Sequence, residues 1–154
     1  MDFDKKIDEL FLDLPEALPE SGAVANAVQV GKLIFLSGAL PWKEGKIAYK
    51  GRLGLEVSID NGRAAAHAAC MQALGTLRNF LGGSLNKVKQ VVHLKGYISS
   101  GGDFHEQQKV LDGASRLLHD IFGDTAGKHA RTAVGVNVLP NNAAIELELV
   151  VEVK

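Results

Sequence analysis

Residues Lys128–Val153, KHARTAVGVNVLPNNAAIELELVVEV, contain the most informative pattern in this chain. They predict two strands with alternating side chains, joined as a hairpin by a Pro-Asn-Asn turn. Arg131 begins the first strand, and an arginine there could bind a carboxylate through its planar fork. On the second strand the acidic residues share one face and the apolar residues share the other (Glu146, Glu148 and Glu152 against Ile145, Leu147, Leu149, Val151 and Val153). Charges on strands are more often simply exposed to solvent, and the pattern alone favours that interpretation.

Composition limits the class of protein. A length of 154 residues suits a single domain, 1–154, with a short N-terminal helical extension at 1–21. The 17 basic and 18 acidic residues leave a net charge of −1 without a basic stripe, which argues against a nucleic-acid partner. Neither a signal peptide nor a membrane-spanning run is recognised, so we expect a cytoplasmic protein. The single cysteine, Cys70, lies in an alanine-rich helical run and is expected in the core.

The apolar spacing along the chain predicts the following order of elements. We expect an N-terminal helix ending before Pro15, then strands at 24–30 and 32–36, and a loop at 43–54 with a short strand near 47–49. A helix from Ser58 or Asp60 to Leu81 and a strand at 88–98 should follow. The chain would then form a helix that is opened by a capping box at Asp103–Glu106 and ends at Gly123, and finally the C-terminal hairpin. The apolar stripe of the first helix would comprise Phe3, Ile7, Leu10, Phe11 and Leu14.

This order predicts an α+β sandwich with helices on one face of the sheet. The other face would carry Tyr97, Val24 and alternate positions of the final strands, with too many apolar groups to face water. Such faces often pack against copies of themselves. We therefore expect an oligomer, with any functional site at the subunit boundary.

Several kinds of catalytic site are not indicated by the sequence. It has no phosphate-binding glycine loop, no histidines at metal-ligand spacing, and no nucleophile-elbow motif around Ser37. His67, His93, His105 and His119 are interpreted as structural or exposed. His129 differs, because it would point to the same side as Arg131 if the strand already runs there.

Two ordered motifs resemble the signatures of the Rid (YjgF) family. Residues Gly31–Pro41, GKLIFLSGALP, are similar to its N-terminal signature, a glycine and an apolar strand followed by Ser-Gly-Gln-x-Pro. Residues His129–Pro140 and then Ala144–Glu148 are similar to its C-terminal signature of Arg-Ser/Thr, an apolar strand, Leu-Pro and Ile-Glu-Ile-Glu. The resemblance covers about Gly22 to Val153, and the N-terminal helix and residues 107–128 indicate a divergent, longer branch.

The resemblance implies a chorismate-mutase-like fold in a homotrimer around a central β-barrel, with ligand sites in clefts between subunits. It implies hydrolytic deamination of amino-acid-derived enamines or imines to 2-keto acids and ammonia, without a metal or an organic cofactor. Carried over by motif, Arg131 would bind the substrate carboxylate, Glu146 would orient water or the imine nitrogen, and backbone groups at Ser37 and Gly38 would complete the pocket. His129 is our additional candidate for proton transfer.

This chain departs from the family pattern at three positions, which leaves the function open. Val24 stands where the deaminases carry a tyrosine, Ala39 replaces the glutamine after Ser-Gly, and Ala133 replaces a cysteine or similar residue two positions after the arginine. One alternative is a non-catalytic trimer that binds small carboxylates. Another is the ribonuclease or translation-inhibitor activity attached to some relatives, which the near-neutral charge disfavours.

Overall fold

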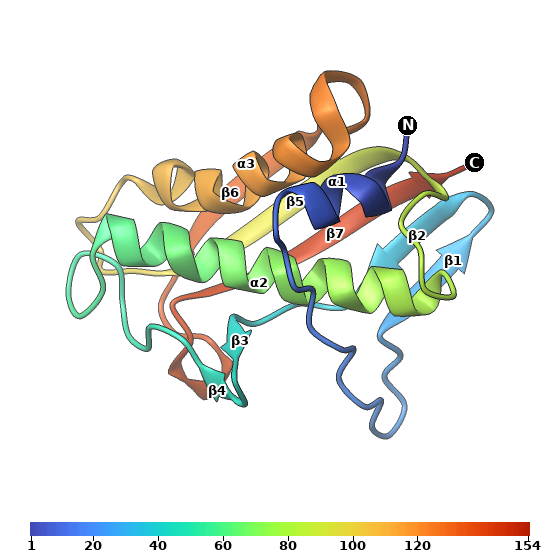
Figure 1. Cartoon of the computed structure of the whole chain (residues 1–154). Coiled ribbons are helices and arrows are strands. Elements are labelled where there is room, and N and C mark those ends of the chain that lie inside the picture. Colours follow the sequence, from blue (N-terminus) through green and yellow to red (C-terminus); the bar gives the residue numbers. More distant parts are fainter.

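The computed structural model describes all residues, 1–154, as one α+β unit. Figure 1 shows two long helices lying across one side of a twisted sheet. In chain order the elements are α1 (Phe3–Glu9), β1 (Ala27–Val30), β2 (Leu33–Leu36), β3 (Trp42–Lys43), β4 (Lys46–Ile47), α2 (Ile59–Phe80), β5 (Val88–Ser99), α3 (Gln107–Ala126), β6 (Ala130–Val136), a 3₁₀ turn (Pro140–Asn142) and β7 (Ile145–Val153).

The main sheet has the order β1-β2-β7-β5-β6, and β3 with β4 forms a separate small hairpin. The predicted C-terminal hairpin is wrong, because β5 lies between β6 and β7. β6 pairs in parallel with β5, whereas β7 is antiparallel to both β5 and β2. The reason is the helix that joins β5 to β6, since a helical crossover returns the chain parallel to the strand it left. β6 therefore becomes an edge strand, and the fully alternating β7 takes the central position.

The core forms between the helices and one face of the sheet, as predicted. Ser58 caps α2 by accepting a hydrogen bond from the Asn61 N–H, and the helix then buries its alanine-rich stripe with Cys70. These small residues allow a close crossing of α2 and α3. At Gly113 of α3 a Cβ would lie 2.2 Å from the carbonyl oxygen of Arg63 in α2, so a larger residue is excluded there.

Two helix boundaries differ from the sequence prediction. α1 ends at Glu9, and Phe11, expected in its apolar stripe, takes a left-handed φ of 55° and is 94% exposed. The predicted capping box does not form. α3 begins at Gln107, whose side-chain Nε2 donates hydrogen bonds to Ser100 Oγ and to the Phe104 carbonyl. The side chain of Glu106, the residue before the helix, makes no capping hydrogen bond. α3 also continues past Gly123 to Ala126, with a kink at that glycine.

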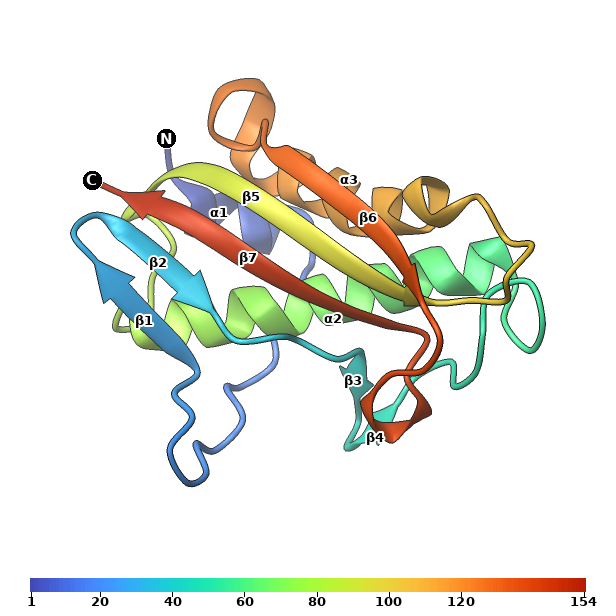
Figure 2. The same ribbon diagram turned by 180° about the vertical axis from the view of Figure 1, so that it is seen from behind.

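The other face of the sheet is covered by no element of this chain, as Figure 2 shows from behind. Apolar side chains on β1 and β2 are exposed there: Val28, Val30, Leu33 and Phe35. Towards β5 and β7 the face becomes polar. The trimer and its central barrel stay predictions that this uncovered face supports. No helix has the length and apolar character needed to cross a bilayer.

Candidate functional site

A cavity of about 170 Å³, which we call the Glu146 cavity, opens where the pairing of β2 with β7 is interrupted. Between the paired residues Phe35 and Val150 and the next bridge, Ala39 to Leu147, the segment that follows β2 advances four residues while β7 advances three. One extra residue is therefore accommodated as a bulge, and bulges commonly redirect side chains next to functional sites. The cavity is lined by Leu18, Asn26, Leu36, Ser37, Gly38, Ala39, Leu40, Trp42, Gln72, Ala73, Thr76 and Glu146.

The bulge brings together three of the five predicted site residues: Ser37, Gly38 and Glu146. Both the backbone and the side chain of Ser37 are hydrogen-bonded. Its N–H donates to the Asn26 carbonyl at 2.9 Å, and its Oγ donates to the Ala25 carbonyl at 2.6 Å. The neighbouring N–H of Gly38 makes no hydrogen bond within the chain. It is an available donor on the wall of the cavity.

Glu146 packs directly against Gly38. A Cβ on that glycine would lie 2.9 Å from both Cδ and Oε2 of Glu146, so the carboxyl group occupies the space that the missing side chain leaves. Burial raises the pKa of the Glu146 carboxyl, and the charge of Glu148 raises it further. Glu148 itself accepts a hydrogen bond from Tyr97 Oη at 2.7 Å, whereas the side-chain carboxyl of Glu146 makes no hydrogen bond in the chain. The Glu146 carboxyl is thus free to contact a ligand and to exchange a proton.

The other two predicted residues, Arg131 and His129, meet on a different surface, beside α3. Arg131 Nη1 donates to Asp112 Oδ1 at 2.6 Å and to Ser115 Oγ at 3.2 Å. Nε2 of His129 lies 2.9 Å from the same Ser115 Oγ, and its Nδ1 lies 2.7 Å from the Gly127 carbonyl. These four side chains form what we call the Arg131 cluster.

The acceptors fix the direction of the hydrogen bonds in this cluster. A carbonyl only accepts, so His129 Nδ1 donates to Gly127, and in that tautomer Nε2 accepts from the Ser115 hydroxyl. Ser115 Oγ in turn accepts from Arg131. Both ring nitrogens of His129 are therefore engaged within the subunit. A role for His129 in proton transfer stays a hypothesis, but its contacts favour positioning.

Arg131 and Glu146 do not form one site within a single chain. Arg131 is paired with the fully buried Leu94 and contacts α3, so it lies on the helix-covered face. Glu146 alternates with the buried Ile145 and Leu147, so it points to the uncovered face. The two residues are also separated across the sheet, because β5 lies between their strands.

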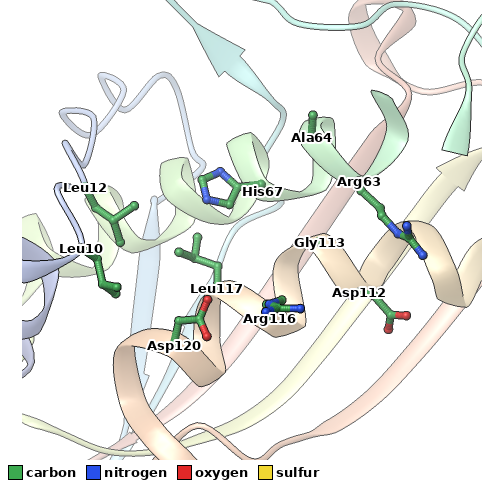
Figure 3. A pocket seen from close by; sticks show the side chains of 10 residues that line it. All are labelled: Leu10, Leu12, Arg63, Ala64, His67, Asp112, Gly113, Arg116, Leu117 and Asp120. Atoms are coloured by element: carbon green, nitrogen blue, oxygen red, sulfur yellow. The ribbon is translucent and has the colours of Figure 1, made fainter. Parts of the chain in front are cut away.

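A larger cavity of about 670 Å³ lies on the outer surface of α2 and α3, and none of the five predicted residues lines it. Figure 3 shows His67 near its centre, with Leu10 and Leu12 at one end and Asp112 at the other. Burial lowers the pKa of His67, and the nearby charge of Lys43 lowers it further. No group of three or more His, Cys, Asp or Glu residues is placed to hold a metal ion.

Sequence reasoning missed several residues around the predicted ones. Asp112 and Ser115 belong to no recognisable sequence motif, because their hydrogen bonds with Arg131 form only when α3 packs on β6. Gln72 and Thr76 of α2 reach the Glu146 cavity in the same way. Trp42 could have been suspected, since the single tryptophan of the chain directly follows the Ser-Gly-Ala-Leu-Pro motif.

Comparisons with known proteins agree with this geometry. Residues 5–153 match the family described as "YjgF/chorismate_mutase-like, putative endoribonuclease". The chain is 36% identical over 146 residues to Protein TCP17 of Trypanosoma cruzi, covering 95% of this chain and 91% of that one. It is similar to the crystal structure of "a putative endoribonuclease" from Shewanella oneidensis, with 32% identity, a TM-score of 0.93, and 99% and 100% of the two chains covered. The crystal structure of E. coli TdcF with bound serine shares the fold, with 16% identity, a TM-score of 0.61, and 90% and 94% coverage.

Proposed function

The chain belongs to the YjgF/chorismate-mutase-like family, and we propose that it hydrolyses amino-acid-derived enamines or imines to 2-keto acids and ammonia. The reaction would take place in clefts between the subunits of a homotrimer. Arg131 of one subunit would bind the substrate carboxylate, and Glu146 of the next would face the reacting carbon and nitrogen.

The observation that carries this proposal is the separation of the two residues on opposite faces of one sheet. Each is available at an open boundary of the chain: Arg131 is on the edge strand β6, and Glu146 is on the uncovered face. A carboxylate clamp and an acid–base group that cannot meet within one chain can meet when a second copy docks. The exposed apolar residues of β1 and β2, for example Phe35, supply surface for such docking.

The cavity chemistry suits an imine. Water adds to the C=N carbon, and the C–N bond of the resulting carbinolamine then breaks to release ammonia and leave the C=O group. The Glu146 carboxyl, whose pKa is raised by burial and by the charge of Glu148, can take a proton from the attacking water and give one to the departing nitrogen. The free N–H of Gly38 can hold a substrate oxygen next to this carboxyl group. No strong nucleophile is needed, because the imine carbon is already electrophilic.

A second candidate function is carriage or sensing of small carboxylates without catalysis. Ala39 lines the Glu146 cavity where the family has a glutamine, so that position supplies no side-chain hydrogen bond to a ligand. Val24, at the position of the family's tyrosine, is 67% exposed and does not line the cavity. The departure at Ala39 therefore removes a polar group from the cavity, while Arg131 and Glu146 are retained. TdcF, which shares the fold, was crystallised with serine, a small amino acid.

The deciding experiment measures keto-acid release from 2-aminoacrylate and 2-iminobutyrate generated in situ. The wild type should accelerate release, and Arg131→Ala and Glu146→Gln should each lower the acceleration by about 100-fold or more. No acceleration by the wild type, together with binding of 2-oxobutanoate, would leave the carboxylate-binding function. An RNA-cleavage assay on the same preparation tests the endoribonuclease activity for which relatives are named, and we expect none because the chain has a net charge of −1.

A further inference from the structure

We propose that Asp112 and Ser115 of α3 are positioning residues that aim one edge of the Arg131 guanidinium at the substrate carboxylate. This inference rests on the proposed function and adds residues that no motif of the chain indicated. It also assigns His129 a supporting place behind Ser115.

The guanidinium of Arg131 has more N–H donors than its partners in the chain use. Arginine has five N–H donors, one on Nε and two on each terminal nitrogen. Both hydrogens of Nη1 are used, one by Asp112 Oδ1 and one by Ser115 Oγ. Nε and Nη2 make no hydrogen bond in the chain. The free Nε–Nη2 edge is a complete two-donor fork of the kind that binds a carboxylate in a bidentate manner.

The Ser115 hydroxyl that holds Nη1 of Arg131 is itself fixed in orientation. The Ser115 hydroxyl cannot turn freely, because it donates to His129 Nε2, and that ring is fixed by its own bond to the Gly127 carbonyl. The carboxylate of Asp112 and this fixed hydroxyl approach Nη1 together. The plane of the guanidinium is therefore set from the α3 side, and the Nε–Nη2 edge is left without a partner on a side chain that is 23% exposed.

Asp112 has a second, opposing effect on a carboxylate ligand. Its negative charge lies 2.6 Å from the guanidinium, so it repels a second carboxylate while it holds the arginine in place. Two substitutions separate these effects. Asp112→Asn keeps a hydrogen-bond acceptor and removes the charge, whereas Asp112→Ala removes both.

The test is calorimetric titration with 2-oxobutanoate and, as an uncharged comparison, 2-oxobutanamide. Asp112→Asn should bind 2-oxobutanoate at least as tightly as the wild type. Asp112→Ala and Ser115→Ala should bind it about tenfold more weakly than Asp112→Asn, because a hydrogen bond to a charged group is lost in each. Binding of the amide should not distinguish the variants. Equal affinity of Asp112→Ala and Asp112→Asn would overturn the proposal, since Asp112 would then act only through its charge.

Asp120→Ala is the matched control, because it removes the same charge from the same helix without touching Arg131. It should bind 2-oxobutanoate like the wild type.

A ligand-free measurement keeps this inference separate from the proposed function. In the wild type, NMR of ¹⁵N-arginine-labelled protein should show slow rotation about the Cζ–Nη1 bond of Arg131. Rotation should become fast in Asp112→Ala and Ser115→Ala and stay slow in Asp120→Ala. Fast rotation in the wild type would overturn the positioning role, whatever the ligand data show. Slow rotation without any carboxylate binding would instead count against the proposed function alone.

Discussion

Gly38→Ala tests whether the position of the Glu146 carboxyl decides activity. The new Cβ would lie 2.9 Å from Glu146 Cδ and Oε2. Ordinary carbon contacts are about 3.5–4.0 Å, so the carboxyl group must move by roughly 0.6–1 Å. The backbone itself can accept alanine, because Gly38 is not among the residues with positive φ.

The fold should tolerate this change better than the reaction does. The displaced atoms are at the end of a flexible side chain, so we expect the free energy of unfolding to change by less than about 1 kcal/mol. A catalytic group misplaced by about 1 Å can cost roughly 100-fold in rate, which corresponds to roughly 2.7 kcal/mol. We therefore expect acceleration of 2-iminobutyrate hydrolysis to fall about 100-fold while the melting temperature stays close to that of the wild type.

Controls assign the loss to Glu146. Gly102→Ala is the matched variant, since a Cβ there meets nothing within 4 Å and its φ is not positive, and it should keep full activity. In the Glu146→Gln background, Gly38→Ala should cause little further loss, because both changes act on the same group. Independent, multiplying losses in the double variant would refute the reasoning, as would full activity of Gly38→Ala.

Four further measurements follow from the structure. Glu146→Gln should stabilise the protein at pH 7 and have little effect below about pH 4.3, the pKa of an unperturbed glutamate. Because the pKa of Glu146 is raised in the folded state, the folded protein holds this proton more tightly than the unfolded chain, and wild-type stability falls as the pH rises from the unfolded pKa through the folded one. A difference in melting temperature between wild type and variant that is the same at every pH would contradict this. Arg131→Lys keeps the charge but loses the fork, and we expect about tenfold weaker binding of 2-oxobutanoate by calorimetry; equal affinity would argue against a bidentate clamp. Phe35→Glu on the uncovered face should give monomers by light scattering, whereas Leu55→Glu in a loop should not, and trimers of both variants would place the interface elsewhere. Burial raises the pKa of the Cys70 thiol to about 12, so thiol reagents should modify it only after unfolding, and rapid labelling of the native protein would show that this helix opens.

Local sequence patterns predicted the helices and most strands, where burial and alternation agree along the chain. Helix α2 has Ser58 as its N-cap and Leu81 as its C-cap, close to the predicted boundaries. The alternation of β7 is confirmed at every position from Ile145 to Val153. Phe11 was misplaced because the spacing continues one turn further than the helix, which ends at Glu9.

Strand pairing was not readable in the same way. The residues of β6 and β7 alternate as a hairpin would, yet neither strand contacts the other as a partner. Alternation reports which face of a strand is buried and carries no information about which strand lies beside it. The parallel pairing of β6 with β5 follows from α3, which joins the two strands in the sequence and packs on one face of both.

Motifs and local periodicity were enough to predict the family and the layered fold, and they singled out Ser37, Gly38, Arg131 and Glu146 as candidate site residues. The packing of Gly38 on Glu146 and the contacts of Asp112 and Ser115 with Arg131 arise from the three-dimensional fold. It also decided that Arg131 and Glu146 point to opposite faces of one sheet. Such relations join residues far apart in the chain, and they are fixed by strand order and helix packing, which local patterns do not specify.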